Sequence, residues 1–255
     1  MFRDIYLWFK FYFNIDKMGK GIASKIIYVL LTGIGVSIYF LPEEYSDFTA
    51  LQSWFLQVMA EDNITEDMMV VPLTMQNWIF IGLAMLIIYV SIMLAILYGG
   101  LLMKGFRKEM LNDQNVISNG KFVFRYICFG ILIAVIFIPM AFAFVYLLLL
   151  FVLAIPFMLT AVNNYMSGDM DIVDSIIYAP RSVRGKYLKM MRDLTGSYLI
   201  YIVLDLLVYL LSFVSPTAYM IVSVAFRSWY LLVIARIGAY DYLMTFKRPV
   251  INKLK

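Results

Sequence analysis

Long uncharged apolar segments alternate with short polar segments along the whole chain. Apolar segments of about 20 residues are long enough to cross the roughly 30 Å hydrocarbon core of a bilayer as α-helices. The pattern therefore predicts an all-α polytopic membrane protein whose helices pair as three hairpins. The six predicted transmembrane helices cover residues 22–41, 78–103, 122–138, 140–162, 197–214 and 218–240.

The third and fourth helices are inferred from an uninterrupted uncharged segment. Residues 126–168 contain no charged side chain. This segment is too long for one membrane crossing, and the polar segments on both of its sides are rich in Lys and Arg. Because such segments stay on the cytoplasmic side, the chain must cross twice between them. Proline disfavours a continuous helix, so we expect the turn near Pro139.

Acidic and basic residues are distributed unequally between the polar segments. Residues 42–77 carry seven Asp and Glu residues but no Lys or Arg, and the other polar segments carry nearly all of the 21 basic residues. The asymmetry indicates that loop 42–77 is extracytoplasmic and that both termini are cytoplasmic. We expect residues 1–255 to form one transmembrane domain.

Two shorter segments have the spacing of amphipathic helices. In residues 1–20 the polar side chains share one face and aromatic side chains cover the rest, which predicts an interfacial helix. Phe48–Met59 in the acidic loop also has one apolar face, with Ser46 as the expected N-cap and Asp47 in the first turn. This face is a candidate surface for a protein partner, formed by Phe48, Leu51, Trp54, Phe55 and Val58.

Composition restricts the chemistry of the chain. It is 63% hydrophobic with a mean hydropathy of +0.84, and it contains no His and a single Cys, Cys128. His-based zinc sites, Ser-His hydrolysis and intramolecular disulfides are excluded for this chain alone. We expect no catalytic set, no cofactor and no metal site. The net charge of +4 reflects membrane orientation rather than nucleic-acid binding.

Asp205 and Arg227 lie deep within the last two predicted spans. Each is 11 residues from Pro216, the expected centre of the hairpin turn, which places both near the middle of the membrane. Because an isolated charge there is costly, we predict an intramembrane Asp205–Arg227 ion pair. The pair would either clasp the two helices together or act as a relay for a proton, an ion or a substrate.

A basic segment precedes the fifth span. Its bases are spaced as on one helix and are candidate contacts for anionic lipid. The alternative is that these bases only set the orientation of the chain in the membrane. The acids of loop 42–77 have a similar alternative: they would be solvated rather than bind a basic partner. The bases are Arg181, Arg184, Lys186, Lys189 and Arg192.

Residues 151–242 combine the proline-containing span FVLAIPFMLTAV, Asp174 with the basic segment that follows, Gly196, and the stretch from Trp229 to Gly238. This combination resembles a group of prokaryotic six-helix integral membrane proteins of unknown function, which includes the membrane domain fused to some glycerophosphodiester phosphodiesterases. The resemblance implies a six-helix fold and a prokaryotic plasma membrane but supplies no activity, because the chain has no phosphodiesterase domain.

These features favour a non-enzymatic membrane protein. It would be an accessory, partner-binding or immunity-type subunit, or a lipid-interacting scaffold, with membrane lipids and a protein at loop 42–77 as partners and with no nucleic acid. An oligomer is compatible with this role. The alternative is a small transporter or channel subunit that uses Asp205 and Arg227, which would require a polar cavity lined by several spans.

Overall fold

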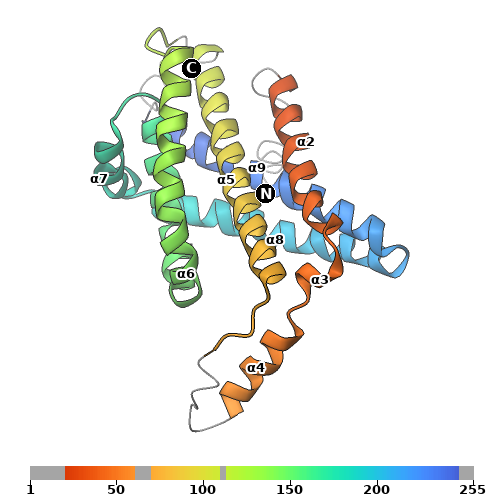
Figure 1. Cartoon of the computed structure of the whole chain (residues 1–255). Coiled ribbons are helices and arrows are strands. Elements are labelled where there is room, and N and C mark those ends of the chain that lie inside the picture. Colours follow the sequence, from red (N-terminus) through yellow and green to blue (C-terminus); the bar gives the residue numbers. More distant parts are fainter. Residues whose placement is uncertain (1–20, 61–69, 110–112, 247–255) are drawn as a thin grey trace.

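The computed structural model describes residues 21–60, 70–109 and 113–246, and this part of the chain is helical without strands (Figure 1). The interfacial helix expected over residues 1–20, and four of the seven acids of loop 42–77, lie outside the described residues. The helices in chain order are α2 (Gly21–Ser37), η1 (Ile38–Phe40), α3 (Glu43–Ser46), α4 (Thr49–Ala60), α5 (Met75–Glu109), α6 (Asn119–Met166), α7 (Ile172–Val183), α8 (Tyr187–Tyr209), η3 (Leu210–Phe213) and α9 (Pro216–Phe246).

Five helices of the described residues are long and apolar enough to cross a membrane. They match five of the six predicted spans. They run over Ile22–Phe40, Met75–Lys108, Asn119–Ile136, Tyr187–Phe213 and Pro216–Leu243. In the region of the remaining span the structure has a shorter apolar helical stretch, Val152–Met166. The chain therefore has the composition and helix lengths of a membrane-embedded protein.

Helix α6 folds back on itself. A straight helix would place Arg125 and Tyr165 about 60 Å apart. Instead, Arg125 Nη1 donates a hydrogen bond of 2.8 Å to the Tyr165 carbonyl oxygen, and the rings of Phe129 and Tyr165 lie 5.8 Å apart. The two ends of α6 are therefore neighbours, so the chain reverses direction between them; the turn near Pro139 stays a prediction.

Helix α9 is the centre of the fold. It contacts α2, α5, α6 and α8, and Leu232, Val233 and Ile237 on it are completely buried. Two glycines allow neighbouring helices to approach closely. A Cβ on Gly35 of α2 would lie 2.6 Å from Val224 of α9, and a Cβ on Gly100 of α5 would lie 2.8 Å from the Phe122 ring of α6. The helices therefore approach closely at Gly35 and Gly100, where a larger side chain would meet its neighbour.

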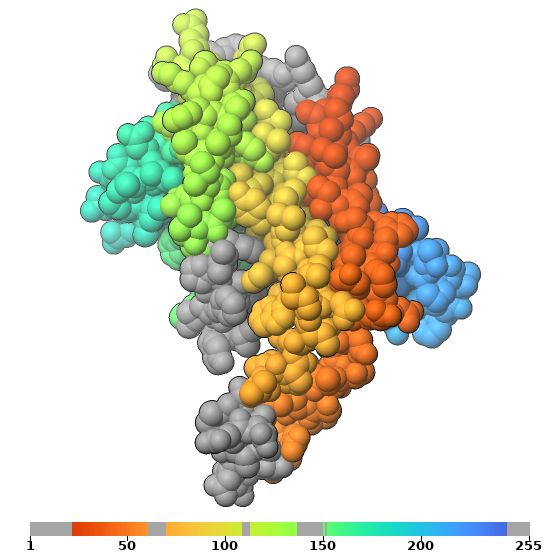
Figure 2. All heavy atoms as spheres, in the orientation of Figure 1, coloured from red at the N-terminus to blue at the C-terminus, as the bar shows by residue number. Residues whose placement is uncertain are grey.

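Helix α4 projects away from the other helices (Figures 1 and 2). It begins after Asp47, whose carboxylate accepts hydrogen bonds from the backbone and hydroxyl of Thr49. These two hydrogen bonds lower the pKa of the Asp47 carboxyl below its usual value, and the bond from the Thr49 hydroxyl contributes more than the bond from its backbone. Asp47, rather than the expected Ser46, therefore caps this helix, because the Ser46 hydroxyl instead donates to the Glu43 carbonyl.

The basic segment before the fifth span is not one continuous helix. Helix α7 ends at Val183 and α8 begins at Tyr187, with Gly185 between them at a φ of +79°. A left-handed backbone interrupts an α-helix and suits glycine. The single helix expected for these bases is therefore wrong: Arg181 belongs to α7, Arg184 and Lys186 to the turn, and Lys189 and Arg192 to α8.

Candidate functional site

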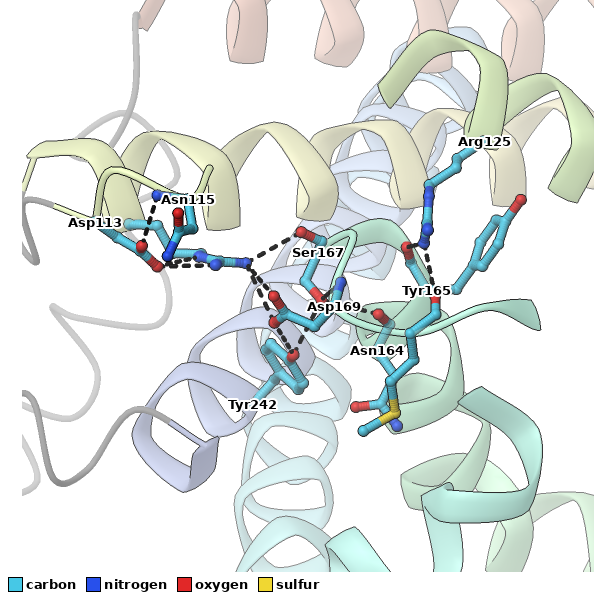
Figure 3. Close-up of polar contacts among 10 residues, drawn as sticks. Asp113, Asn115, Arg125, Asn164, Tyr165, Ser167, Asp169 and Tyr242 are labelled. Carbon is cyan, nitrogen blue, oxygen red and sulfur yellow. Dashed lines mark hydrogen bonds and ion pairs between the residues drawn. The ribbon is translucent and has the colours of Figure 1, made fainter. Parts of the chain in front are cut away.

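A buried arginine connects four parts of the chain at one end of the bundle. Arg107, near the end of α5, is only 2% exposed. Its guanidinium contacts Asp113 at 2.8 Å and Asp169 at 3.2 Å, and it donates to the Ser167 carbonyl at 3.0 Å. The Tyr242 hydroxyl of α9 bonds Asp169 and Ser167, each at 3.0 Å (Figure 3). We call Arg107, Asp113, Ser167, Asp169 and Tyr242 the Arg107 cluster.

The backbone after α6 brings the carboxylate to this arginine. Ser167 closes the helix by donating from its backbone to Asn163 and from its hydroxyl to the Asn164 carbonyl. Gly168 then adopts a φ of +84° against Ile117, a conformation that L side chains rarely adopt. The resulting turn directs Asp169 back toward α5. The charges of the Arg107 cluster are thus paired and hydrogen-bonded, as a stable buried site requires.

Two of the acids after α6 pair with arginines. Asp169 belongs to the Arg107 cluster, and Asp171, which is 88% exposed, pairs with Arg125 at 3.5 Å. Arg125 also donates to the Met170 carbonyl at 2.6 Å and lies over the Tyr165 ring. Among the described residues no group of three or more Asp, Glu, Cys or His side chains could hold a metal ion.

A second group of charges joins the start of α8 to the end of α9. Asp193 and Asp241 are 3% and 2% exposed. Lys189 donates to Asp241 at 3.1 Å, and Arg192 contacts Asp193 at 3.3 Å. The second carboxylate oxygen of Asp241 is buried without a hydrogen-bond partner. This group ties the start of α8 to the end of α9.

Asp205 and Arg227 both lie near Tyr201, in the middle of the α8–α9 hairpin, and both act electrostatically on its hydroxyl. Among the described residues, no ion pair within 4.0 Å joins the two charges, and Asp205 Oδ1 is buried without a hydrogen-bond partner. Arg227 is exposed. Direct pairing within one chain thus stays a prediction.

The packing of the hairpin explains why Tyr201, rather than Asp205, lies opposite Arg227. The Tyr201 ring stacks on Phe226 at 5.2 Å and on Tyr230 at 4.3 Å, and Tyr209 contacts Tyr219 at 5.8 Å. These contacts centre the turn near residue 214 rather than at Pro216. A two-residue shift of the turn moves the opposing helix by four residues, about one helical turn. Arg227 therefore faces Tyr201, and Asp205 lies about one helical turn nearer the connection between α8 and α9.

The expected partner surface on α4 is partly covered and partly open. Phe48 packs edge-on against Phe80 at 5.7 Å, and Leu51, Trp54 and Val58 are half-buried, whereas Phe55 is 55% exposed. Two further apolar side chains extend the open part, namely Leu56 (62%) and Met59 (72%). A surface hollow of about 560 Å³ lies at the start of α4 and is lined by residues 46–49, Leu51, Gln52 and Phe55.

Asn77 attaches this outer region to α5. It is 3% exposed, and its side-chain amide donates to the backbone oxygens of Tyr45 (3.3 Å) and Asp47 (2.8 Å). Its side-chain oxygen accepts from the backbone and hydroxyl of Thr74. The buried Asn77 amide therefore joins the base of the α4 segment to α5, beside the packing of Phe48 on Phe80.

The candidate lipid-binding bases are found near an open apolar surface. Arg181, Arg184, Lys189 and Arg192 are exposed, while Lys186 is half-buried. Helix α7 turns Ser175, Ala179 and Val183 toward the protein, and it contacts α6. Its outward stripe consists of Val173 (62% exposed), Ile176 (56%) and Ile177 (58%).

Sequence reasoning missed the most buried charges of the described residues. It did not single out Arg107 among the bases that follow the second predicted span, and it took Asp205 and Arg227 as the charges that lie deep in the spans. Arg236 also lies within a predicted span and is 2% exposed. The available signal was that Arg236 lies inside the last predicted span and that Asp241 directly follows it.

Comparisons with known proteins found no match: no family model, no curated protein and no solved structure resembles this chain.

Proposed function

We propose that the chain is an integral protein of a prokaryotic plasma membrane with six spans arranged as three hairpins. Five apolar helices and the contact between the two ends of α6 support this count, with residues 152–166 belonging to the sixth span. The distribution of acids and bases supports cytoplasmic termini and an extracytoplasmic loop 42–77.

Its role in this proposal is to bind a protein partner outside the membrane, as a non-enzymatic accessory or immunity-type subunit. The observation that carries the proposal is α4, which projects from the bundle and exposes Phe55, Leu56 and Met59. Glu43 and Glu44 near its base are exposed as well. An apolar surface beside acids suits a partner segment that is apolar and basic.

Photo-crosslinking in native membranes tests this role. A photoreactive phenylalanine at position 55 should give a discrete protein adduct, which mass spectrometry identifies. The same group at Ser53, on the opposite side of α4, is the matched control. Leu56→Glu should abolish the adduct, because it places a carboxylate in the apolar contact. Equal adducts at both positions, or adducts with lipid alone, would contradict the proposal.

Sidedness is tested separately with impermeant maleimide on intact cells. The Cys128→Ala background removes the native thiol. Ser53→Cys should be labelled in intact cells, and Gln114→Cys should be labelled only after the membrane is opened. The reverse pattern would overturn the orientation but not the binding role.

A small transporter or channel subunit is the second candidate function, favoured by one observation. Asp205 carries a buried oxygen without a partner near the middle of a predicted span, and such a group is a candidate for proton or ion transfer. Asp205→Asn should then abolish ion flux into vesicles that contain the purified chain. Under the accessory role the vesicles show no flux with either residue.

A further inference from the structure

Helix α7 is held between the ends of two candidate membrane spans. On its N-terminal side, Asp169 contacts Arg107 near the end of α5 at 3.2 Å. On its C-terminal side, Lys189 in the first turn of α8 contacts Asp241 near the end of α9 at 3.1 Å. With α5 and α9 across the membrane as proposed above, α7 lies at the boundary between acyl chains and headgroups.

The outer face of α7 is apolar and open. Its inner side contacts α6, and the helix lies at the edge of the bundle (Figures 1 and 2). Its outward side chains Val173, Ile176 and Ile177 are all exposed. An apolar stripe at the level of the span ends is placed to contact the acyl chains of the bilayer.

Two arginines at the end of this helix have no carboxylate partner. Arg181 is in the last turn of α7, Arg184 follows the helix, and both are exposed. Among the described residues neither of them takes part in an ion pair, whereas Lys189 and Arg192 are paired with buried carboxylates. The Arg184 backbone N–H donates to the Arg181 carbonyl oxygen at 3.3 Å, which closes a turn whose end Cα atoms lie within about 7 Å of each other. Two long side chains that start so close together can reach the same anion.

We propose that α7 and the turn after it form a site for an anionic phospholipid, with Arg181 and Arg184 at the headgroup phosphate and the outer face of α7 against the acyl chains. Arginine suits this contact because its planar fork of donors matches phosphate oxygens. Ile177 and Arg181 are four residues apart and share a face of the helix, so a cation lies beside the apolar stripe. A headgroup with net negative charge is favoured over a zwitterionic one, whose own cation repels the arginines. The site is separate from the partner surface on α4, and it rests on the membrane location proposed above for α5 and α9.

The test measures how strongly brominated lipids quench a dye on α7. The full-length Cys128→Ala chain, with the dye attached at Ile177→Cys, is reconstituted into phosphatidylcholine vesicles that contain a minor fraction of phosphatidylglycerol. In one preparation the phosphatidylglycerol carries bromine on its acyl chains, and in the other an equal amount of the phosphatidylcholine does. Phosphatidylglycerol should be enriched beside the dye about fivefold to thirtyfold over its share of the bilayer, since each base near the surface contributes a factor of about five.

Two charge-matched double variants separate a local site from general attraction by a basic surface. Arg181→Gln with Arg184→Gln should reduce the quenching by phosphatidylglycerol to the level expected from its share of the bilayer. Lys108→Gln with Lys121→Gln removes two other exposed bases and should leave the enrichment unchanged. All four side chains are exposed, so neither double variant should change thermal unfolding.

Three results would overturn the proposal: equal quenching by the two lipids, an unchanged arginine variant, or an equal loss in the lysine variant. A dye that neither lipid quenches would also overturn it, and the outer face of α7 would then be covered by protein or water. The maleimide labelling tests membrane location independently. Correct labelling without a preference for phosphatidylglycerol would therefore count against this lipid site alone.

Discussion

Arg107 and Asp169 are 62 residues apart in the chain and meet at 3.2 Å between guanidinium Nη1 and carboxylate Oδ1. Arg107 is followed in sequence by Lys108, an exposed base at the same end of α5. The two neighbours would contribute equally to membrane orientation. They differ in burial, and therefore in what their removal does to the fold.

Arg107→Ala should lower the stability of the purified protein by about 3 kcal/mol, because it leaves Asp113, Asp169 and the Ser167 carbonyl without their donor. This value is at the lower end for a broken buried pair, since Asp169 is 34% exposed and water replaces part of the lost contact. Lys108→Ala is the matched control and should change stability by less than about 0.5 kcal/mol. Thermal unfolding in detergent, followed by Trp fluorescence, measures both. Equal losses would show that Arg107 is no more than an orienting base.

Two glycines of α5 should respond in opposite directions to alanine. A Cβ at Gly100 would lie 2.8 Å from Phe122 and 3.2 Å from Met166, both of which are buried, so Gly100→Ala should cost about 1–3 kcal/mol. A Cβ at Gly82 meets nothing within 4 Å, so Gly82→Ala should be neutral or stabilise the helix by up to about 1 kcal/mol. Thermal unfolding of the two variants compares them directly. A stabilising Gly100→Ala would contradict the close packing of α5 on α6.

Removal of the Asn77 side chain should loosen the outer region without unfolding the bundle. Asn77→Ala leaves the carbonyls of Tyr45 and Asp47 without their donor, at a cost of about 1–3 kcal/mol. Hydrogen exchange of the amides of residues 43–60 should then become about tenfold faster or more, while exchange in α9 stays unchanged. Gln76→Ala, which truncates the neighbouring amide, is the control. If both variants exchange at the wild-type rate, Asn77 does not hold the base of α4.

The apolar helices could be predicted from sequence because hydropathy is a local property. Five of the predicted spans coincide, to within a few residues at their ends, with parts of helices that are long enough to cross a membrane. Contacts between α8 and α9 were harder to place, because they depend on where the connecting turn is centred. A turn centred near residue 214 instead of Pro216 replaces Asp205 by Tyr201 opposite Arg227.

The Arg107 cluster could not be predicted for a different reason. Its members come from α5, the following loop, the α6–α7 connection and α9, so no local spacing relates them. Positive charges next to apolar segments have a sufficient explanation in membrane orientation. Only the three-dimensional arrangement separates Arg107, which is buried and paired, from Lys108, which is exposed.

Helix α7 should lie at the membrane surface with Ile176 among acyl chains. Val173, Ile176 and Ile177 form its exposed stripe, and Arg181 in its last turn is placed to reach anionic headgroups. In the Cys128→Ala background, an environment-sensitive dye on Ile176→Cys should be quenched by lipids that carry bromine on the acyl chain. The same dye on Asp174→Cys, another exposed position of α7, should be quenched by aqueous iodide instead. Iodide quenching at both positions would place α7 in water, and its apolar stripe would then be a surface for protein rather than for lipid.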